Sequence, residues 1–404
     1  MAVAPKLVMQ LADRAGRVSL SPTSAIVTEA DRLRASGVDV INFGVGEPDF
    51  PTPDNIKQAA MRAIENNFTK YTPTPGIQPL REAVCAWHRR EFGSSYQPEE
   101  SVITVGGKQA LFNALGSLVN DGDEVVIAAP YWVSYPDMIR FCGGEPKVVH
   151  PDPAAGFHLR AADVEVALGP RTRAVIVNSP NNPSGAVVAE SEFARILELC
   201  ASRNLWLITD ECYSHFVYDG RRPYSVASLP EGKPHLIVAG SCSKTFSMTG
   251  WRIGYALAPK PLIDAMIRLQ SQSTSNPNSI AQYAALEALT GPMDSVRTML
   301  AEYARRRDLV SEALARIPGV VCAAPEGTFY AFPSVTGTPR ARALQQKQQA
   351  AETERLAVDL LTQAHVGVVA GEAFGAPGYV RISFALAQDR LKEGLERLGQ
   401  FLSA

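Results

Sequence analysis

Hydrophobic residues between about residues 54 and 260 form short runs that alternate with amphipathic stretches. The runs are rich in β-branched side chains and occupy residues 102–105, 125–128, 174–178, 205–209 and 236–239. Such alternation is typical of a mainly parallel sheet covered by helices. One helix is predicted from residue 108 onward, because Leu111, Leu115 and Leu118 fall on one helical face. The pattern therefore predicts an α/β fold.

Beyond residue 300 the pattern changes to a long polar helix at residues 301–317, a GTFYAF segment, a Gln/Ala-rich stretch at residues 341–361 and a short strand at residues 379–384. We interpret this part as a second, smaller α+β domain. The first fifty residues contain a strand-like run at residues 40–43 and the turn-rich sequence GVGEPDFPTP, which could pack on either domain. Residues 336–349 are predicted to be either a mobile loop or the solvated approach to a helix.

The chain has 404 residues, enough for two domains, and a net charge of only −2. This balance disfavours nucleic acid and anionic membrane surfaces as partners. No apolar stretch approaches the roughly 18 residues of a membrane span, and charged residues interrupt the N-terminus before signal-peptide length. The six cysteines lack CxxC spacing, which indicates reduced thiols and a cytoplasmic protein. The six histidines lack metal-ligand spacing, so we predict no metal.

Unusual polar sequences follow each of the five apolar runs. They read GGK, APYW, NSPNNPSG, DECY and GSCSK in chain order. In an open parallel sheet, the ligand site lies beyond the carboxyl ends of the strands. The five sequences are therefore expected to converge on one site.

Lys244 ends the last of these sequences, and Arg252 follows eight residues later in TGWRIG. A lysine forms an imine only when it is neutral, so it needs burial or a nearby cation to lower its pKa. Ser241, Ser243 and Arg252 together offer two hydroxyl groups and a guanidinium, a donor set that suits a phosphate dianion. Taken alone, the four-residue sequence would favour a surface loop with a solvated lysine.

Asp210 ends the apolar run LWLIT and is expected to lie deep in the sheet, where an unpaired carboxylate is costly. A protonated pyridine nitrogen would be a suitable partner, and a helix N-cap or a pair with an arginine is the alternative. The amide of Asn182 and the hydroxyl of Tyr213 can donate to a phenolate-like oxygen. Trp132 could stack on a planar cofactor, or could belong to the core.

In combination, NSPNNPSG, DECY, SCSKTFSMTGWRIG and RISFA resemble the fold-type I pyridoxal 5'-phosphate enzymes of the class I aminotransferases, in particular the bacterial aspartate aminotransferase branch. The resemblance runs from about residue 19 to the C-terminus. It implies a mainly parallel seven-stranded sheet in a large cofactor domain at residues 50–295. A small domain is expected from both termini, at residues 1–49 and 296–404. The resemblance also implies a homodimer.

The resemblance assigns cofactor-binding roles residue by residue. Lys244 resembles the catalytic Schiff-base lysine, and Asp210 resembles the partner of the pyridine nitrogen. Asn182 and Tyr213 resemble the pair that holds the 3'-oxygen, and Trp132 resembles the ring-stacking aromatic residue. The phosphate cup is expected from Gly107, Lys108, Ser241, Ser243 and Arg252, with Tyr71 reaching in from the partner subunit.

Substrate contacts follow from the same resemblance. Arg381 in RISFA resembles the arginine that binds the substrate α-carboxylate, and Gly46 resembles a backbone contact to the substrate. Trp132 and Asn182 are expected to bind the substrate as well. Amino acids and 2-oxo acids are the implied substrates, with aspartate and 2-oxoglutarate as the expected pair. The resemblance also implies ping-pong kinetics through pyridoxamine phosphate.

Two positions bear on the choice of amino acid. Ser271 stands where the animal and enteric-bacterial branch has a partner-subunit arginine for the side-chain carboxylate of aspartate, so Lys108 is expected to make that contact instead. Ala25 falls where members that accept prephenate are expected to have a hydroxyl residue, which argues against prephenate. Aromatic amino acids and prephenate remain the alternative substrates.

Other classes of protein fit the sequence less well. Ser241 and Lys244 match the S-x-x-K spacing of penicillin-recognising enzymes, but the SDN and KTG elements of that class are absent. A non-catalytic ligand sensor is possible in principle, although no helix-turn-helix domain precedes the core. GGKQ lacks the spacing of a P-loop, and GVGEPDF lacks the third glycine of the dinucleotide fingerprint.

Overall fold

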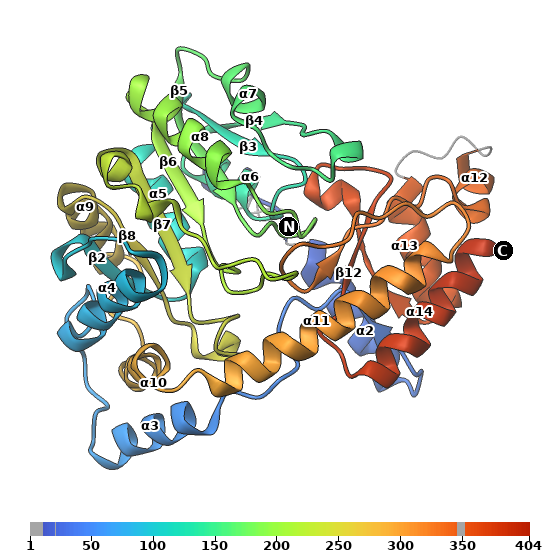
Figure 1. Ribbon diagram of the computed structural model, residues 1–404, viewed down its shortest axis with the longest axis horizontal. Helices are drawn as coiled ribbons and strands as arrows, with labels where there is room; N and C mark the ends of the chain where they lie inside the picture. The colour runs from blue at the N-terminus through green and yellow to red at the C-terminus, as the bar shows by residue number, and fades with distance from the viewer. Residues whose placement is uncertain (1–10, 21, 346–351) are drawn as a thin grey trace, which may run out of the picture.

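A seven-stranded sheet forms the larger part of the computed structural model, which describes residues 11–20, 22–345 and 352–404. The strand order is β2-β8-β7-β6-β5-β3-β4, with β8 antiparallel to both of its neighbours and the remaining pairs parallel (Figure 1). The prediction of a mainly parallel seven-stranded sheet is therefore confirmed. The strands are β2 (Ser101–Thr104), β3 (Glu124–Ala128), β4 (Glu145–Val149), β5 (Thr172–Asn178), β6 (Trp206–Asp210), β7 (Leu236–Ser241) and β8 (Gly254–Leu257).

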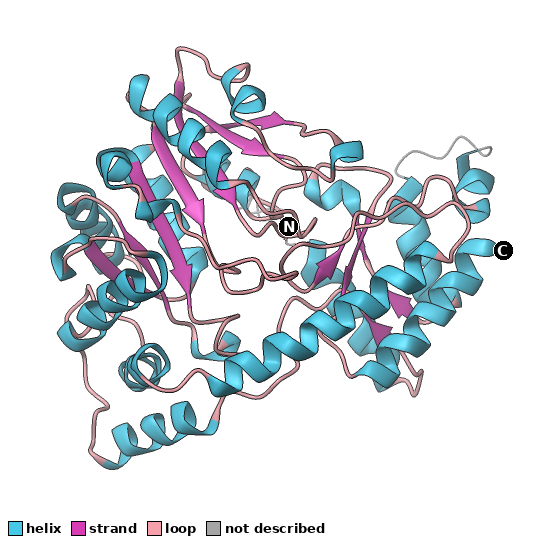
Figure 2. Cartoon of the chain, viewed as in Figure 1, coloured by secondary structure: helices cyan, strands magenta, loops and turns pink. Residues whose placement is uncertain are grey.

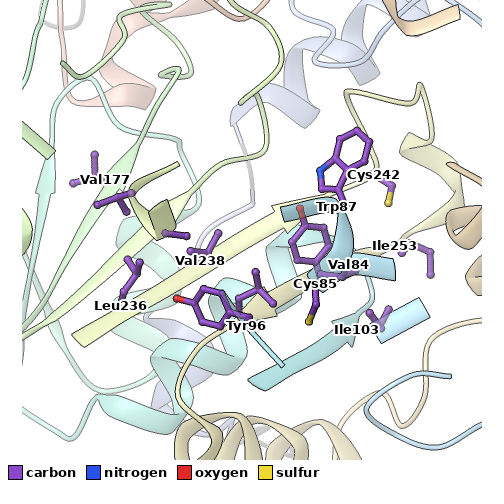
Figure 3. Close-up of a cluster of buried hydrophobic side chains, with 14 of the residues drawn as sticks. Val84, Cys85, Trp87, Tyr96, Ile103, Val177, Leu236, Val238, Cys242 and Ile253 are labelled. Carbon is purple, nitrogen blue, oxygen red and sulfur yellow. The ribbon is translucent and has the colours of Figure 1, made fainter. Parts of the chain in front are cut away.

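Helices cover both faces of this sheet (Figure 2). Alternate residues of each strand point to opposite faces, so Ile208 packs on the side of α5 and Leu207 on the side of α4. Figure 3 shows the α4 side, where Trp87 of α4 and Val238 of β7 lie in one apolar cluster. One side carries α5 (Gly107–Leu118), α6 (Tyr135–Phe141) and α9 (Lys260–Ser271), and the other carries α3 (Asp54–Glu65), α4 (Gln78–Phe92), α7 (Ala161–Glu165), α8 (Glu190–Ser202) and α10 (Ser279–Thr290).

The apolar runs did not predict strands β4 and β8. Strand β4 reads EPKVV and forms an edge of the sheet, where one unpaired side tolerates charged residues and proline. Strand β8 reads GYAL and starts with a glycine for a steric reason. A Cβ on Gly254 would lie 2.3 Å from the backbone nitrogen of Gly107, so only glycine fits between the two segments.

The remaining elements form two smaller sheets with their own helices. Strand β1 pairs with β10 in parallel, and β12 lies between β11 and β9 in an antiparallel sheet. The elements are β1 (Ile41–Asn42), β9 (Tyr330–Ala331), β10 (Val366–Gly367), β11 (Val369–Ala370), β12 (Val380–Ser383), α1 (Asp13–Gly16), α2 (Pro22–Ala35), α11 (Asp294–Ala315), α12 (Pro339–Gln345), α13 (Glu352–Gln363) and α14 (Gln388–Ser403).

Two expectations for this region need correction. The long polar helix begins at Asp294, before the predicted residue 301. Of the two alternatives for residues 336–349, the mobile loop is wrong where helix α12 forms, because Ala341 and Leu344 are buried in a hydrophobic core. Residues 346–349 lie outside the described residues.

Helix α11 connects two hydrophobic cores. Its first turn contributes Val296 to the core under α4, and Met299 and later residues belong to a second core that includes Ile41 of β1 and Leu398 of α14. In Figure 1 this helix runs obliquely from the large sheet toward α12, α13 and α14. Across the described ranges, the helices are all too short or too polar to cross a bilayer.

Candidate active site

A cavity of about 470 Å³ lies beyond the carboxyl ends of the parallel strands, where the five polar sequences meet. Its lining combines residues from the large sheet with Gly44, Gly46, Tyr330 and Arg381 of the second region. The predicted site residues that line it are Gly46, Gly107, Lys108, Trp132, Asn182, Asp210, Tyr213, Ser241, Ser243, Lys244, Arg252 and Arg381. Tyr71 does not line this cavity and is 92% exposed.

Lys244 follows β7 and points its amine into the cavity. The Nζ atom donates to the carbonyl oxygen of Gly46 at 2.6 Å. Burial lowers the pKa of Lys244, and the positive charges of Arg381 and Arg252 act in the same direction to a lesser extent. A lowered pKa favours the neutral amine, which is the form that attacks a carbonyl carbon.

Asp210 is the last residue of β6 and is 8% exposed. Its carboxylate accepts a hydrogen bond from the Tyr135 hydroxyl at 2.7 Å and another from the backbone N–H of Cys212 at 3.2 Å. Burial raises the pKa of Asp210, whereas these two hydrogen bonds and the charge of Lys244 oppose that rise. This carboxylate is therefore hydrogen-bonded to a phenol and a backbone amide, and not to the arginine considered above. It can bind a cationic group in the cavity.

Another part of the cavity lining presents hydrogen-bond donors. Helix α5 begins at Gly107 without a side-chain cap, next to the hydroxyls of Ser241 and Ser243, which lie 2.9 Å apart, and the guanidinium of Arg252. A Cβ on Gly106 would lie 2.5 Å from Nη2 of Arg252, and the φ angle of Gly106 is +77°, so glycine is required there. Helix N–H groups, hydroxyls and a guanidinium form a donor set that suits a phosphate dianion.

Arg381 is 2% exposed, yet its guanidinium has no carboxylate partner among the described residues. Nη1 donates to Oδ1 of Asn182 at 3.1 Å and Nη2 to the carbonyl oxygen of Gly44 at 2.9 Å, while Nε has no partner. The guanidinium also lies 4.4 Å from the centre of the Tyr330 ring. A buried cation with a free N–H fits a small carboxylate ligand.

Aromatic residues complete the walls of the cavity. The hydroxyl of Tyr213 lies 3.0 Å from that of Tyr330. The amine of Lys108 lies 4.9 Å from the centre of the Trp132 ring, and burial, with a smaller contribution from Arg252, lowers the pKa of Lys108. Lys108, which lines the cavity, is therefore a partly desolvated cation.

The predictions missed several residues that contact the predicted ones, among them Tyr135, Asn178 and Tyr330. Tyr135 starts α6, three residues after Trp132, and its contact with Asp210 has no local sequence signal. Asn178 begins NSPNNPSG, and its side chain accepts from the N–H of Asn182 at 2.8 Å. Tyr330 lies in GTFYAF and is 1% exposed.

The two positions considered for substrate choice lie elsewhere. Ser271 ends α9, and its hydroxyl donates to the carbonyl oxygen of Arg268 at 2.7 Å, outside the cavity of its own chain. Ala25 belongs to α2, but its side chain lies outside the described residues. Nearby, Thr28 of the same helix lines the cavity.

A second cavity of about 550 Å³ adjoins the first and shares Lys108, Val133, Ser134 and Arg252 with it. Its further lining is largely apolar and includes Phe112, Met138 and Phe141.

The residues of the main cavity fit a flat, phosphorylated, basic cofactor. Its lining includes a buried carboxylate, a set of anion-binding donors and an amine of lowered pKa. Within the described ranges, no three His, Cys, Asp or Glu side chains are grouped so as to hold a metal ion.

Known proteins resemble this chain along nearly its whole length. Residues 38–398 match the sequence profile of a family described as aminotransferase class I and II. The chain is 45% identical over 393 residues to an aspartate/prephenate aminotransferase of Cereibacter sphaeroides, covering 97% of this chain and 98% of that one. It is 40% identical to an aspartate aminotransferase of Geobacillus stearothermophilus, covering 98% and 100%. A solved aspartate aminotransferase of Thermus thermophilus with maleate superposes with a TM-score of 0.90 at 41% identity, covering 98% and 100%.

Proposed function

The chain belongs to the class I and II aminotransferase family, and from this premise we propose that it transfers the amino group of L-aspartate to 2-oxoglutarate with pyridoxal 5'-phosphate as cofactor. The observation that carries this proposal is the meeting of Lys244, Asp210 and Arg381 in one cavity. An amine of lowered pKa, a buried carboxylate and a guanidinium with a free N–H are the three groups that amino transfer requires.

The phosphate end of the cavity would hold the cofactor through the backbone of Gly107 and Lys108 and the side chains of Ser241, Ser243 and Arg252. At about 1.5–3 kcal/mol for each charged hydrogen bond, three or four contacts would bind it firmly. Trp132 supplies the aromatic face, and Asn182 and Tyr213 supply donors for the 3'-oxygen. When bound, pyridoxal phosphate acts as an electron sink that stabilises a carbanion at the substrate Cα.

Two buried residues would place charges next to the cofactor and the substrate. Asp210 would keep the pyridine nitrogen protonated, and the donors from Tyr135 and Cys212 favour its ionised form. Arg381 would bind the substrate α-carboxylate through the donor that its protein contacts leave free. Gly46 contributes its carbonyl oxygen, which already orients the Lys244 amine.

Lys244 would perform the proton transfers. Its amine is held inside the cavity and its pKa is lowered, so it can take the proton from the substrate Cα and return it as an acid. The two half-reactions use the same residues in reverse order, so we expect ping-pong kinetics through pyridoxamine phosphate.

Lys108→Ala tests the choice of amino donor. The Lys108 side chain is a cation that lines the cavity, so we expect the variant to lose about 10- to 100-fold in kcat/KM for aspartate while kcat/KM for alanine changes little. The measurement is a panel of amino donors with 2-oxoglutarate. An unchanged ratio of aspartate to alanine would show that Lys108 does not bind the distal carboxylate.

Aromatic amino acids or prephenate are the second candidate amino-group partners. The adjoining apolar cavity supports this alternative, because it continues from Lys108 and could accept a ring. The same donor panel decides between the two, provided that it includes phenylalanine, tyrosine and prephenate.

We further propose a cytoplasmic homodimer with a cofactor domain at residues 50–295 and a small domain at residues 1–49 and 296–404. The six cysteines are all free, as expected in a reducing compartment. Tyr71 is almost fully exposed in the single chain. Met61 and Ile64 on α3 are each about half exposed. A tyrosine left in water at this place suits a role in the site of a second copy.

Mixing two impaired variants tests the shared site. Tyr71→Ala should weaken cofactor binding about 10- to 100-fold, the loss of one charged hydrogen bond. A hybrid dimer combines one Tyr71→Ala subunit with one Lys244→Ala subunit, so one of its two sites contains neither substitution. At limiting cofactor, the activity of the hybrid should therefore exceed the sum of the activities of the two separate variants. Hybrid dimers are verified by two affinity tags, and hybrids that show only additive activity would contradict the role of Tyr71.

A further inference from the structure

Glu211 is a buried carboxyl group that the proposed reaction does not use. It follows Asp210 at the end of β6, and its N–H donates to the carbonyl oxygen of Ala239 in β7 at 2.9 Å, so the strand pairing continues. Neighbouring residues of a strand point to opposite faces. Ile208 belongs to the core on the α5 side and Leu207 to the core on the α4 side. Asp210 therefore faces the α5 side and the cavity, whereas Glu211 faces the α4 side.

The carboxyl group of Glu211 meets only neutral partners. Oε1 accepts hydrogen bonds from Ser225 at 2.8 Å and from Thr209 at 3.0 Å. Oε2 is buried without a hydrogen-bond partner, and no ion pair within the described ranges includes this residue. The charge of Glu211 influences the pKa of Tyr96, Tyr224 and Tyr255, and the charge of Asp210 influences that of Glu211. His88 contacts the Tyr255 hydroxyl at 2.9 Å.

An ionised Glu211 would be a buried negative charge without a cation, which is costly. Burial raises its pKa to about 8, the two hydroxyl donors oppose this rise, and the neighbouring charge of Asp210 adds to it. Two adjacent buried carboxyl groups cannot both ionise readily. Asp210 has the hydroxyl of Tyr135 and the N–H of Cys212 to favour its charge, so the single charge belongs on Asp210.

We propose that Glu211 remains a neutral carboxylic acid at neutral pH and is a positioning residue that keeps the negative charge of the pair on the cavity side of β6. The protonated state follows from the surroundings of Glu211 alone. The effect on catalysis rests on the role proposed above for Asp210.

Infrared difference spectroscopy tests the protonation state directly. Spectra of the cofactor-free protein from about pH 6 to about pH 10 are compared between wild type and Glu211→Gln. We expect a neutral-carboxyl band in the wild type at pH 7 that disappears around pH 8 and is absent from the variant. Glu145→Gln, an exposed position on β4, is the control and should leave the band unchanged. A band that persists in Glu211→Gln, or no such band in the wild type, would overturn the proposal. The wild-type titration remains informative if the variant folds poorly.

The pH dependence of unfolding gives an independent measurement. The folded chain keeps a proton that the unfolded chain releases between about pH 4.5 and about pH 8, because burial raises the pKa of Glu211. As pH rises through this window, the ionisation of Glu211 therefore increases the unfolding equilibrium constant of the wild type by up to about tenfold per pH unit. Above about pH 8, Glu211 causes no further increase. Glu211→Gln should lack this contribution, and equal slopes in the two proteins would contradict it.

Catalysis provides the readout for positioning. Glu211→Gln should keep kcat at pH 7 within about threefold of wild type, because an amide imitates a neutral acid. The wild type should lose kcat above about pH 8 as Glu211 ionises, and the variant should not. Identical alkaline limbs would overturn the positioning role. A complete absence of amino transfer in the wild type would instead overturn the proposed function, and the infrared result would stand.

Discussion

Replacing Lys244 with alanine is expected to lower kcat by at least about 10⁴-fold. Proton transfer by a positioned side chain contributes about 10²- to 10⁴-fold by itself, and Lys244 would serve as both base and acid. Among the described residues that line the cavity, the other lysine is Lys108, whose amine is held over the Trp132 ring. Steady-state assays with aspartate and 2-oxoglutarate measure kcat, and the absorbance of the lysine-bound cofactor should disappear as well.

Two controls separate this effect from misfolding. Lys392→Ala removes an exposed lysine of α14 and should leave kcat unchanged. Lys244→Ala should unfold at no lower temperature than the cofactor-free wild type near pH 7, because burial already disfavours the charged amine. The folded-state pKa lies below 10.5, so the wild type gains stability as pH rises toward that value, and the variant should lack this gain. Retained turnover in Lys244→Ala would exclude it as the catalytic residue.

The sheet was predictable where its strands are buried on both faces. Strands β5, β6 and β7 read as continuous apolar runs because helices cover both of their sides. Strands β4 and β8 carry no such signal. Strand β4 lies at an edge and includes exposed or partly exposed residues, and β8 begins with Gly254 because that residue closely approaches Gly107. The boundary predicted between residues 295 and 296 falls inside helix α11, and the division into two domains stays a prediction.

The site was predictable because chain topology brings strand ends together. Asp210, Lys244 and the GGK sequence each follow a strand, so a parallel sheet is enough to place them in one cavity. Tyr135 and Tyr330 could not be found in this way. Tyr135 reaches Asp210 across 75 residues of chain, and Tyr330 enters from the second region, so both contacts depend on tertiary packing.

Asp210→Asn is expected to lower kcat about 10³-fold while the protein stays folded. At about 3 Å and an effective dielectric constant near 20, the attraction between a carboxylate and a pyridinium is roughly 5 kcal/mol before desolvation is subtracted. If about 4 kcal/mol of this attraction is lost in the transition state, the rate falls about 10³-fold. Asparagine keeps the volume of the side chain and an oxygen that can accept from Tyr135 or Cys212. The measurement is kcat at saturating aspartate and cofactor.

The charge, and not the shape, of Asp210 should explain this loss. A cofactor analogue with a fixed positive charge on the ring nitrogen should therefore restore much of the activity of Asp210→Asn, whereas added pyridoxal phosphate should not.

Burial raises the pKa of Asp210, so the cofactor-free wild type loses stability as pH rises from about 3.8 through the folded-state value. The asparagine variant should lack this penalty and be at least as stable at neutral pH. Asp389→Asn, at the exposed start of α14, is the matched control. Near-normal turnover in Asp210→Asn, or no rescue by the charged analogue, would remove Asp210 from the reaction as proposed.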